Sequence, residues 1–218
     1  MRTKLPSGTT AELAHPPSGP AEQGLVVVPD VMGMRPLFDD LVARLASAYG
    51  WSVCAFELYP GREDLEVVAR LEAASTLVDE RVLGDAVAAA ELTGAARVSI
   101  LGFCMGGMYT LKAVATGRFD RHCPFYGMIR VPDSWRGPGQ GEPLDALAVG
   151  DASSVLAVIG VEDRWTPPED VDALAATGAT VARYEGADHG FVHDPSRPAH
   201  RADAAADAWE RVVGWLSA

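Results

Sequence analysis

The 218-residue chain is short of positive charge and has no long apolar run. It carries 18 lysines and arginines against 30 aspartates and glutamates, which gives a formal net charge of −12 at pH 7. Because nucleic acids and anionic membranes attract clustered cations, this balance argues against binding to either. No stretch of about 18 apolar residues occurs, so we expect no membrane span.

Cysteine is also scarce. The three cysteines, Cys54, Cys104 and Cys123, are too few and too widely spaced for a disulfide framework or a paired metal or redox motif. Cys54 and Cys123 lie inside predicted strands, where free cysteine acts as a small buried hydrophobe. The N-terminal segment has no apolar core typical of a secretion signal, so we expect a cytoplasmic protein with reduced thiols. We expect no metal and no organic cofactor, because the histidines in HDPSRPAH are widely spaced and have no third ligand nearby.

Short apolar runs alternate with helical patterns along the chain. The β-branched run at 24–29 lacks polar alternation, as do strands covered on both faces of a parallel sheet. Pro36 then opens a pattern of apolar residues three and four apart that ends near Gly50 and predicts a helix. The predicted strands are 9–14, 24–29, 51–58, 97–102, 121–126, 155–160 and 180–184. The predicted helices are 36–50, one or two within 65–92 with Gly84 as the candidate break, 105–116, 167–176 and a C-terminal helix.

This alternation of strands and helices predicts an α/β fold, a mostly parallel sheet with helices on both faces. The length and composition fit a single domain over residues 1–218. In such sheets the functional groups gather on the loops at the carboxyl ends of the strands. Candidate residues are therefore sought on those loops.

The segment GFCMGG places Cys104 on the turn between a predicted strand and a predicted helix. Its spacing matches the nucleophile elbow G-x-S-x-G, with sulfur in place of the hydroxyl. Gly102 and Gly106 let such a strained turn close and let the helix pack on the sheet. The helix N-terminus favours a thiolate, and the amide of Met105 is placed to stabilise an oxyanion. Cys104 is therefore the predicted nucleophile.

A nucleophilic thiol needs a base, and the base needs an orienting group. His189 lies in EGADHGF directly after the last predicted strand, on a loop at the carboxyl edge. The loop GVEDRWTPP carries Glu162 and Asp163 one strand away. Asp163 is further from the strand end and is the better candidate, although spacing alone leaves Glu162 open. The order cysteine, aspartate, histidine is the chain order of the α/β-hydrolase triad.

With these motifs, the sequence resembles the dienelactone hydrolase family, small single-domain α/β hydrolases with a cysteine nucleophile. The resemblance runs from about Gly24 to the final helix, and its best matches are GFCMGG, GVED, EGADHGF, VVVPDVMG and FELYPGR. It implies a catalytic triad of Cys104, Asp163 and His189, which favours Asp163 over Glu162.

The resemblance also assigns roles to the loop after the first core strand. In the family a glutamate there holds the resting thiol, and the matched residue is Asp30, whose side chain is one methylene shorter. The oxyanion hole is implied to consist of the backbone amides of Met105 and Val31.

Substrate contacts are implied on neighbouring loops. Family members that hydrolyse dienelactone bind its carboxylate with arginines, one of them four residues after the catalytic histidine, where this chain has His193. The second arginine is implied to be Arg62, Arg70 or Arg81. Aromatic residues beside the carboxyl-edge loops are predicted to line the pocket, with closure of the core as the alternative: Phe38, Trp135, Trp165 and Phe191.

The sequence thus predicts a thiol-dependent hydrolase of small esters or lactones that forms a thioester intermediate. Two alternatives are a broad carboxylesterase or thioesterase and a non-catalytic small-molecule binder on the same fold. The expected partner is a small-molecule ester or lactone, without nucleic acid or membrane. We expect a monomer or a weak homodimer.

Overall fold

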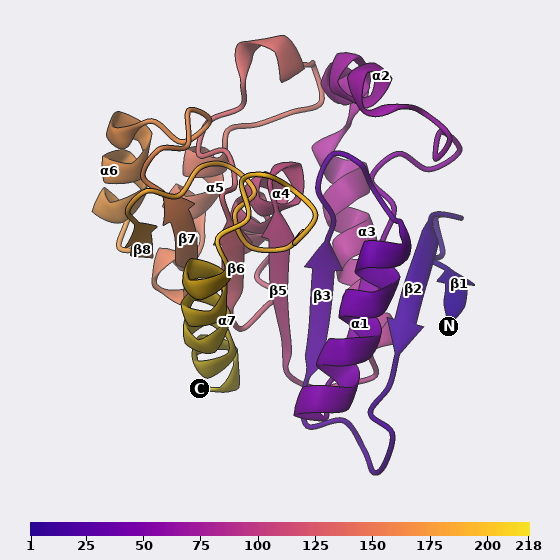
Figure 1. The fold of residues 1–218 in the computed structure, drawn as a ribbon. Coiled ribbons are helices and arrows are strands. Elements are labelled where there is room, and N and C mark those ends of the chain that lie inside the picture. Colours follow the sequence, from indigo (N-terminus) through magenta and orange to yellow (C-terminus); the bar gives the residue numbers. More distant parts are fainter.

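One eight-stranded sheet runs through the computed structural model, which describes residues 1–218 (Figure 1). The strands are β1 (Arg2–Lys4), β2 (Thr10–Ala14), β3 (Gly24–Val28), β4 (Ser52–Phe56), β5 (Val98–Phe103), β6 (His122–Phe125), β7 (Leu156–Gly160) and β8 (Thr180–Tyr184). The α-helices are α1 (Pro36–Tyr49), α2 (Val67–Glu72), α3 (Asp79–Leu92), α4 (Met105–Lys112), α5 (Pro143–Val149), α6 (Pro168–Ala176) and α7 (Ala202–Ser217). Short 3-10 helices lie at Ala73–Thr76, Ala113–Thr116, Asp133–Trp135 and Ala152–Ser154.

The strand order in the sheet is β1-β2-β4-β3-β5-β6-β7-β8. β1 pairs with β2, and β2 with β4, in antiparallel orientation, whereas every other neighbouring pair is parallel. The predicted mostly parallel sheet is therefore confirmed. Because the six strands β3, β4, β5, β6, β7 and β8 run in the same direction, the loops that follow them emerge at one edge.

Helices cover both faces of this sheet. The five residues of β3 are all completely or nearly completely buried, and their side chains alternate between two core clusters. Leu25 and Val27 pack with residues of α1 and α7, while Val26 and Val28 pack with residues of α3 and α4. Figure 1 shows α1 and α7 in front of the sheet and α3 behind it. Burial on both faces explains why this strand shows no polar alternation.

The structure differs from the prediction within residues 65–92. The break falls at Leu77 and Val78, which have extended backbone angles, and Gly84 lies inside α3. Asp79 and Glu80 occupy the first turn of α3, where carboxylates offset the helix dipole, so the helix begins at this acidic pair.

Two short elements were not predicted. β1 has only three residues, too few for a period to be recognised, and α5 begins at Pro143, directly after a turn-rich segment. Proline suits the first turn of a helix because it needs no amide partner there. No helix in the chain is both long enough and apolar enough to span a membrane.

Candidate active site

Cys104 lies on a strained turn between β5 and α4. Its φ of 56° and ψ of −118° are unusual for a residue with a side chain. The turn tolerates no side chain at its two flanking glycines. A Cβ on Gly102 would lie 2.3 Å from the carbonyl oxygen of Gly106, and a Cβ on Gly106 would lie 2.2 Å from that of Val28. The glycines of GFCMGG are thus explained by close backbone approach on both sides.

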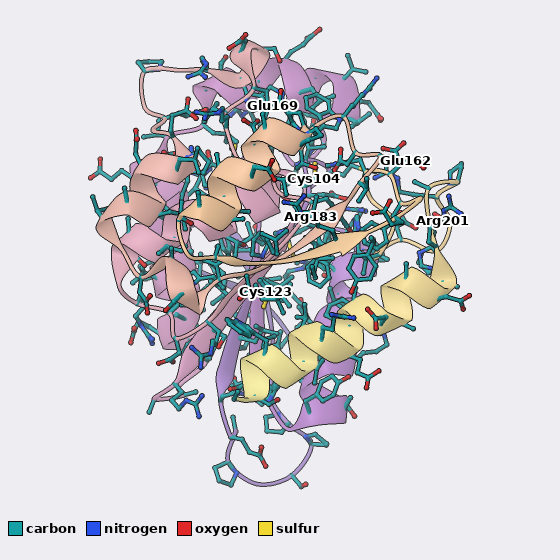
Figure 2. All side chains as sticks on the ribbon, turned by 90° about the vertical axis from the view of Figure 1, so that its left-hand side faces the viewer. Cys104, Cys123, Glu162, Glu169, Arg183 and Arg201 are labelled. Atoms are coloured by element: carbon teal, nitrogen blue, oxygen red, sulfur yellow. The ribbon has the colours of Figure 1, made fainter.

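The three thiols differ in depth. Cys54 and Cys123 are completely buried, and burial raises the pKa of both, that of Cys54 to about 12. Cys104 is only partly buried. Figure 2 shows Cys123 among the strands and Cys104 nearer the end of the sheet that carries the loops. Of the three thiols, Cys104 is therefore the most exposed.

His189 lies on the loop after β8 and is oriented by Asp163 on the loop after β7. Its Nδ1 is 2.7 Å from Oδ2 of Asp163, whose side chain is completely buried. The other carboxylate oxygen, Oδ1, accepts a hydrogen bond from the amide of Trp165 at 2.8 Å. Burial alone would lower the pKa of His189, but the neighbouring Cys104 and the hydrogen bond to Asp163 raise it to about 10. The structure therefore brings Cys104, His189 and Asp163 together, and Asp163 rather than Glu162 contacts the histidine.

The backbone amides of Met105 and Val31 are available as donors. Met105 is the first residue of α4, so its amide has no carbonyl partner within the helix. The amide of Val31 donates no hydrogen bond within the protein. Both residues are buried next to the turn, Val31 on the loop that follows β3.

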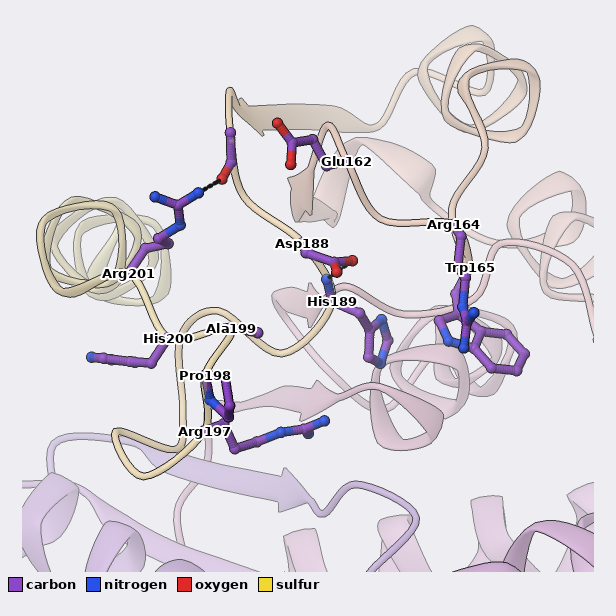
Figure 3. Close-up of a pocket in the computed structure, with 11 residues that line it drawn as sticks. Glu162, Arg164, Trp165, Asp188, His189, Arg197, Pro198, Ala199, His200 and Arg201 are labelled. Carbon is purple, nitrogen blue, oxygen red and sulfur yellow. Dashed lines mark hydrogen bonds between the residues drawn. The ribbon is translucent and has the colours of Figure 1, made fainter.

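A pocket of about 850 Å³ opens on the His189 side of this arrangement. Trp165 lines it and is stacked on Trp135, with ring centroids 5.7 Å apart. Figure 3 shows the His189 ring facing Trp165, with the Arg197 guanidinium extending toward the same space. Cys104 is not among the lining residues, so the pocket reaches His189 rather than the sulfur.

The pocket wall is strongly charged. Its charged or titratable residues besides His189 are Glu162, Arg164, Asp188, Arg197, His200 and Arg201. Arg164 and Arg197 form no ion pair, although the chain has an excess of acidic residues. No group of three or more histidine, cysteine, aspartate or glutamate side chains is arranged to hold a metal ion.

Comparison with known proteins identifies the family. Residues 10–218 match a sequence model of the dienelactone hydrolase family. The chain belongs to the dienelactone hydrolase family. The family, the fold and the enzyme class, a carboxylic ester hydrolase acting on esters or lactones, are therefore confirmed.

Individual relatives give the same assignment. A putative carboxymethylenebutenolidase of Methylorubrum extorquens is 32% identical over 219 residues, covering 90% of this chain and 74% of the relative. A probable 2-oxo-3-(5-oxofuran-2-ylidene)propanoate lactonase of Bradyrhizobium is 30% identical over 224 residues, covering 94% and 88%. The crystal structure of a putative dienelactone hydrolase from Klebsiella pneumoniae aligns with a TM-score of 0.87 at 25% identity, covering 100% of this chain and 97% of that one.

Asp30, at the position matched to the family's glutamate, does not hold the thiol. Its carboxylate accepts hydrogen bonds from both terminal nitrogens of Arg35, at 2.7 and 2.9 Å, and from the amide of Met32 at 2.9 Å. Nε2 of His193 lies 2.8 Å from the same carboxylate. These partners occupy both oxygens, and no hydrogen bond joins Asp30 to Cys104. The expected contact is absent because the shorter acid is bound by a neighbouring arginine and histidine.

Most residues predicted to contact the substrate lie in the core instead. Phe38, Phe191 and the side chain of His193 are buried, and the two phenylalanines belong to the core cluster beneath α1 and α7. Of the five residues predicted to contact substrate, only Trp165 lines the pocket. The other four, His193, Phe38, Trp135 and Phe191, are buried, which was the alternative for the three aromatic residues.

None of the three candidate arginines lines the pocket either. Arg70 is buried and pairs with Glu57 at 2.8 Å, Arg81 pairs with Asp85 at 2.9 Å, and Arg62 bonds the hydroxyl of Thr76 at 3.1 Å.

Glu57 is a buried acid that sequence reasoning missed. Its side chain is fully enclosed and also accepts the amide hydrogen of Met34 at 2.8 Å, which ties the loop after β3 to β4. A Cβ on Gly33 would lie 2.4 Å from the carboxylate of Glu57, so the loop backbone passes directly over it. The only sign of this site in the sequence was an acidic residue within the segment FELYPGR, at the end of a predicted strand.

Proposed function

We propose that this enzyme hydrolyses small esters or lactones through a triad of Cys104, His189 and Asp163 and a covalent thioester. The observation that carries the proposal is that His189 bonds Asp163 at 2.7 Å and neighbours Cys104, which lies on a strained turn at the N-terminus of α4. A helix N-terminus stabilises a thiolate, and a buried carboxylate fixes the imidazole orientation.

In the first half of the reaction, the Cys104 thiolate attacks the carbonyl carbon and forms the carbon–sulfur bond. The negative charge that develops on the carbonyl oxygen is stabilised by the amides of Met105 and Val31. As the intermediate collapses, the carbon–oxygen bond to the alcohol breaks, and imidazolium His189 gives its proton to the leaving oxygen. The acyl group remains on sulfur as a thioester.

In the second half, His189 removes a proton from water, and the resulting hydroxide attacks the thioester. The acid leaves and the thiolate is restored. The raised pKa of His189 suits this sequence, because in the proposed resting state the neighbouring Cys104 is a thiolate. Acylation removes that charge, so the pKa falls and the neutral imidazole becomes able to act as a base.

The titration of His189 provides a direct test of this coupling. Replacing Cys104 by Ala is expected to lower the pKa of His189 from about 10 toward its ordinary value of 6.5, because the negative neighbour is lost. The imidazolium would then be lost at lower pH than in the wild type. NMR titration of the imidazole ring measures the change, and Cys123→Ala, a buried thiol among the strands, serves as the control. Equal pKa values in the wild type and in Cys104→Ala would rule out the ion pair.

The pocket supports a small substrate that can carry negative charge. Arg164 and Arg197 are unpaired and line the same wall as His189. A broad carboxylesterase or thioesterase remains the enzyme alternative, and a dienelactone panel run beside short p-nitrophenyl esters separates the two. A non-catalytic binder would bind such compounds without turnover.

The thioester itself is the decisive species. Rapid quenching of a reaction with p-nitrophenyl acetate is expected to yield enzyme carrying one acetyl group, which peptide mass spectrometry should locate on Cys104. Iodoacetamide should likewise label Cys104 faster than the buried Cys54 and Cys123. Turnover without an acetylated Cys104 would exclude the covalent route. If neither turnover nor acetylation of Cys104 occurs, the non-catalytic binder would be favoured.

A further inference from the structure

His193 joins three loops at the edge of the sheet. It lies four residues after His189, in the loop that follows β8, and its side chain is only 1% exposed. Its Nε2 is 2.8 Å from Oδ2 of Asp30, on the loop after β3. Its Nδ1 is hydrogen-bonded to the hydroxyl of Tyr126, directly after β6. One buried imidazole thus connects segments that are up to 163 residues apart in the chain.

The protonation states of the two outer partners define their parts in these hydrogen bonds. Burial would raise the pKa of Asp30, but hydrogen bonds and charges from His193 and Arg35 hold it well below its usual range, so Asp30 is a carboxylate. Burial raises the pKa of Tyr126 well above its usual value, so its hydroxyl keeps its proton. A carboxylate can only accept, so Nε2–H of His193 donates to Asp30, and the protonated Tyr126 hydroxyl is the hydrogen-bond partner of Nδ1.

At its Asp30 end, the hydrogen-bond network of Asp30, His193 and Tyr126 fixes the loop that carries Val31, the proposed oxyanion donor. Asp30 immediately precedes Val31, its carboxylate accepts the amide hydrogen of Met32 at 2.9 Å, and its carbonyl accepts that of Gly33 at 2.9 Å. Arg35 bonds the carbonyl of Gly33 as well as the carboxylate. The loop around Val31 is therefore held from both sides by groups that meet at Asp30.

At its Tyr126 end, the network fixes an aromatic ring that packs against His189, the proposed base. The Tyr126 ring meets His189 edge-on, with ring centroids 5.2 Å apart and an interplanar angle of 64°. Tyr126 has a φ of 39°, a strained value that its surroundings must maintain. His193 is itself held by stacking on Phe103, with centroids 4.7 Å apart.

We propose that His193 is a positioning residue that, through Asp30 and Tyr126, holds the oxyanion loop and the His189 imidazole in the geometry required for acyl transfer. The proposal rests on the proposed function, because it assigns these two groups their catalytic roles. Displacement of a catalytic group by about 1 Å costs up to about 10²-fold in rate, so loss of the network should affect kcat more than KM.

Two variants test the hydrogen bond between His193 and Tyr126 from its two ends. His193→Gln retains an amide donor toward Asp30 and loses the Nδ1 partner of Tyr126, whereas Tyr126→Phe removes only the hydroxyl. Each is expected to lower kcat for p-nitrophenyl acetate about 10-fold or more while KM changes less than about twofold. The double variant should be little worse than either single variant, because both break the same bond.

The matched control is His122→Gln. His122 is also a buried histidine, but it lies at the amino end of β6 and its Nδ1 is 2.9 Å from the hydroxyl of Ser154. Its replacement is expected to lower the melting temperature and leave kcat per folded enzyme unchanged. A purely structural role for His193 would give the same pattern as this control and would overturn the proposal, as would wild-type kcat in Tyr126→Phe.

The pH profile of Cys104 alkylation by iodoacetamide gives a second readout that needs no substrate. If the His189 imidazole is displaced in Tyr126→Phe, the rate of Cys104 alkylation at neutral pH should fall and its pH profile should move to higher pH. Arg35 and Asp194 are the other charged groups near His193, and both are retained in these variants. Absence of preferential labelling of Cys104 in the wild type would refute the proposed function, whereas identical profiles in wild type and variant would refute only the role of His193.

Discussion

Replacement of Cys104 by alanine is expected to lower kcat/KM for short p-nitrophenyl esters by at least about 10⁴-fold, because the thioester route is lost entirely. The remaining groups still bind the substrate and polarise its carbonyl, so a small residual rate above that in water is expected. Steady-state assays with purified enzyme measure the loss, and circular dichroism confirms that the variant is folded. Cys104 is only partly buried, so its truncation should cost little stability.

The control for this variant is Cys54→Ala. Cys54 is completely buried in β4, so its truncation should lower the free energy of unfolding by about 1 kcal/mol and leave turnover per folded molecule unchanged. Ester turnover by Cys104→Ala near the wild-type rate would show that another group attacks the carbonyl, and the proposed mechanism would fall.

Replacement of Gly106 by alanine is expected to have the largest effect on stability. A Cβ at this position would lie 2.2 Å from the carbonyl oxygen of Val28 and 2.3 Å from that of Pro29. Both are backbone atoms at the end of β3 and cannot move without displacing the sheet or the loop after it. We expect a loss of more than about 4 kcal/mol, or about 10 °C in Tm, measured by thermal unfolding.

Gly84→Ala is the matched control for that substitution. Gly84 lies inside α3, and a Cβ there would have no atom within 4 Å. The change should therefore stabilise the protein by about 0.5–1 kcal/mol, since alanine loses less backbone entropy than glycine on helix formation. Equal Tm values for the two alanine variants would contradict the close packing of α4 against β3.

Much of the active-site layout could be predicted from local patterns. The apolar run of β3 and the strand–turn–helix around GFCMGG depend on neighbouring residues, so period and turn chemistry were sufficient. Asp163 and His189 were predicted because parallel strands bring the loops at their carboxyl ends to one edge. Matching to the family added the choice of Asp163, and the structure places its carboxylate on His189.

The partners of buried polar groups could not be predicted in this way. The resemblance to the family implied that Asp30 holds the thiol, but its oxygens are occupied by Arg35 and by His193, which is 163 residues away. Glu57 and Arg70 gave no pattern at all, yet they form an enclosed ion pair under the loop after β3.

The physical reason is that a buried charge must find a partner of opposite charge or a hydrogen-bond donor, and which donor reaches it depends on the packing of the whole sheet edge. The amino-acid sequence by itself determined the fold, the turn that carries Cys104 and the loops that carry His189 and Asp163. Only the tertiary structure decided which acid, histidine and tyrosine hold those loops in place, because Asp30, His193 and Tyr126 become neighbours only after β3, β6 and β8 have assembled.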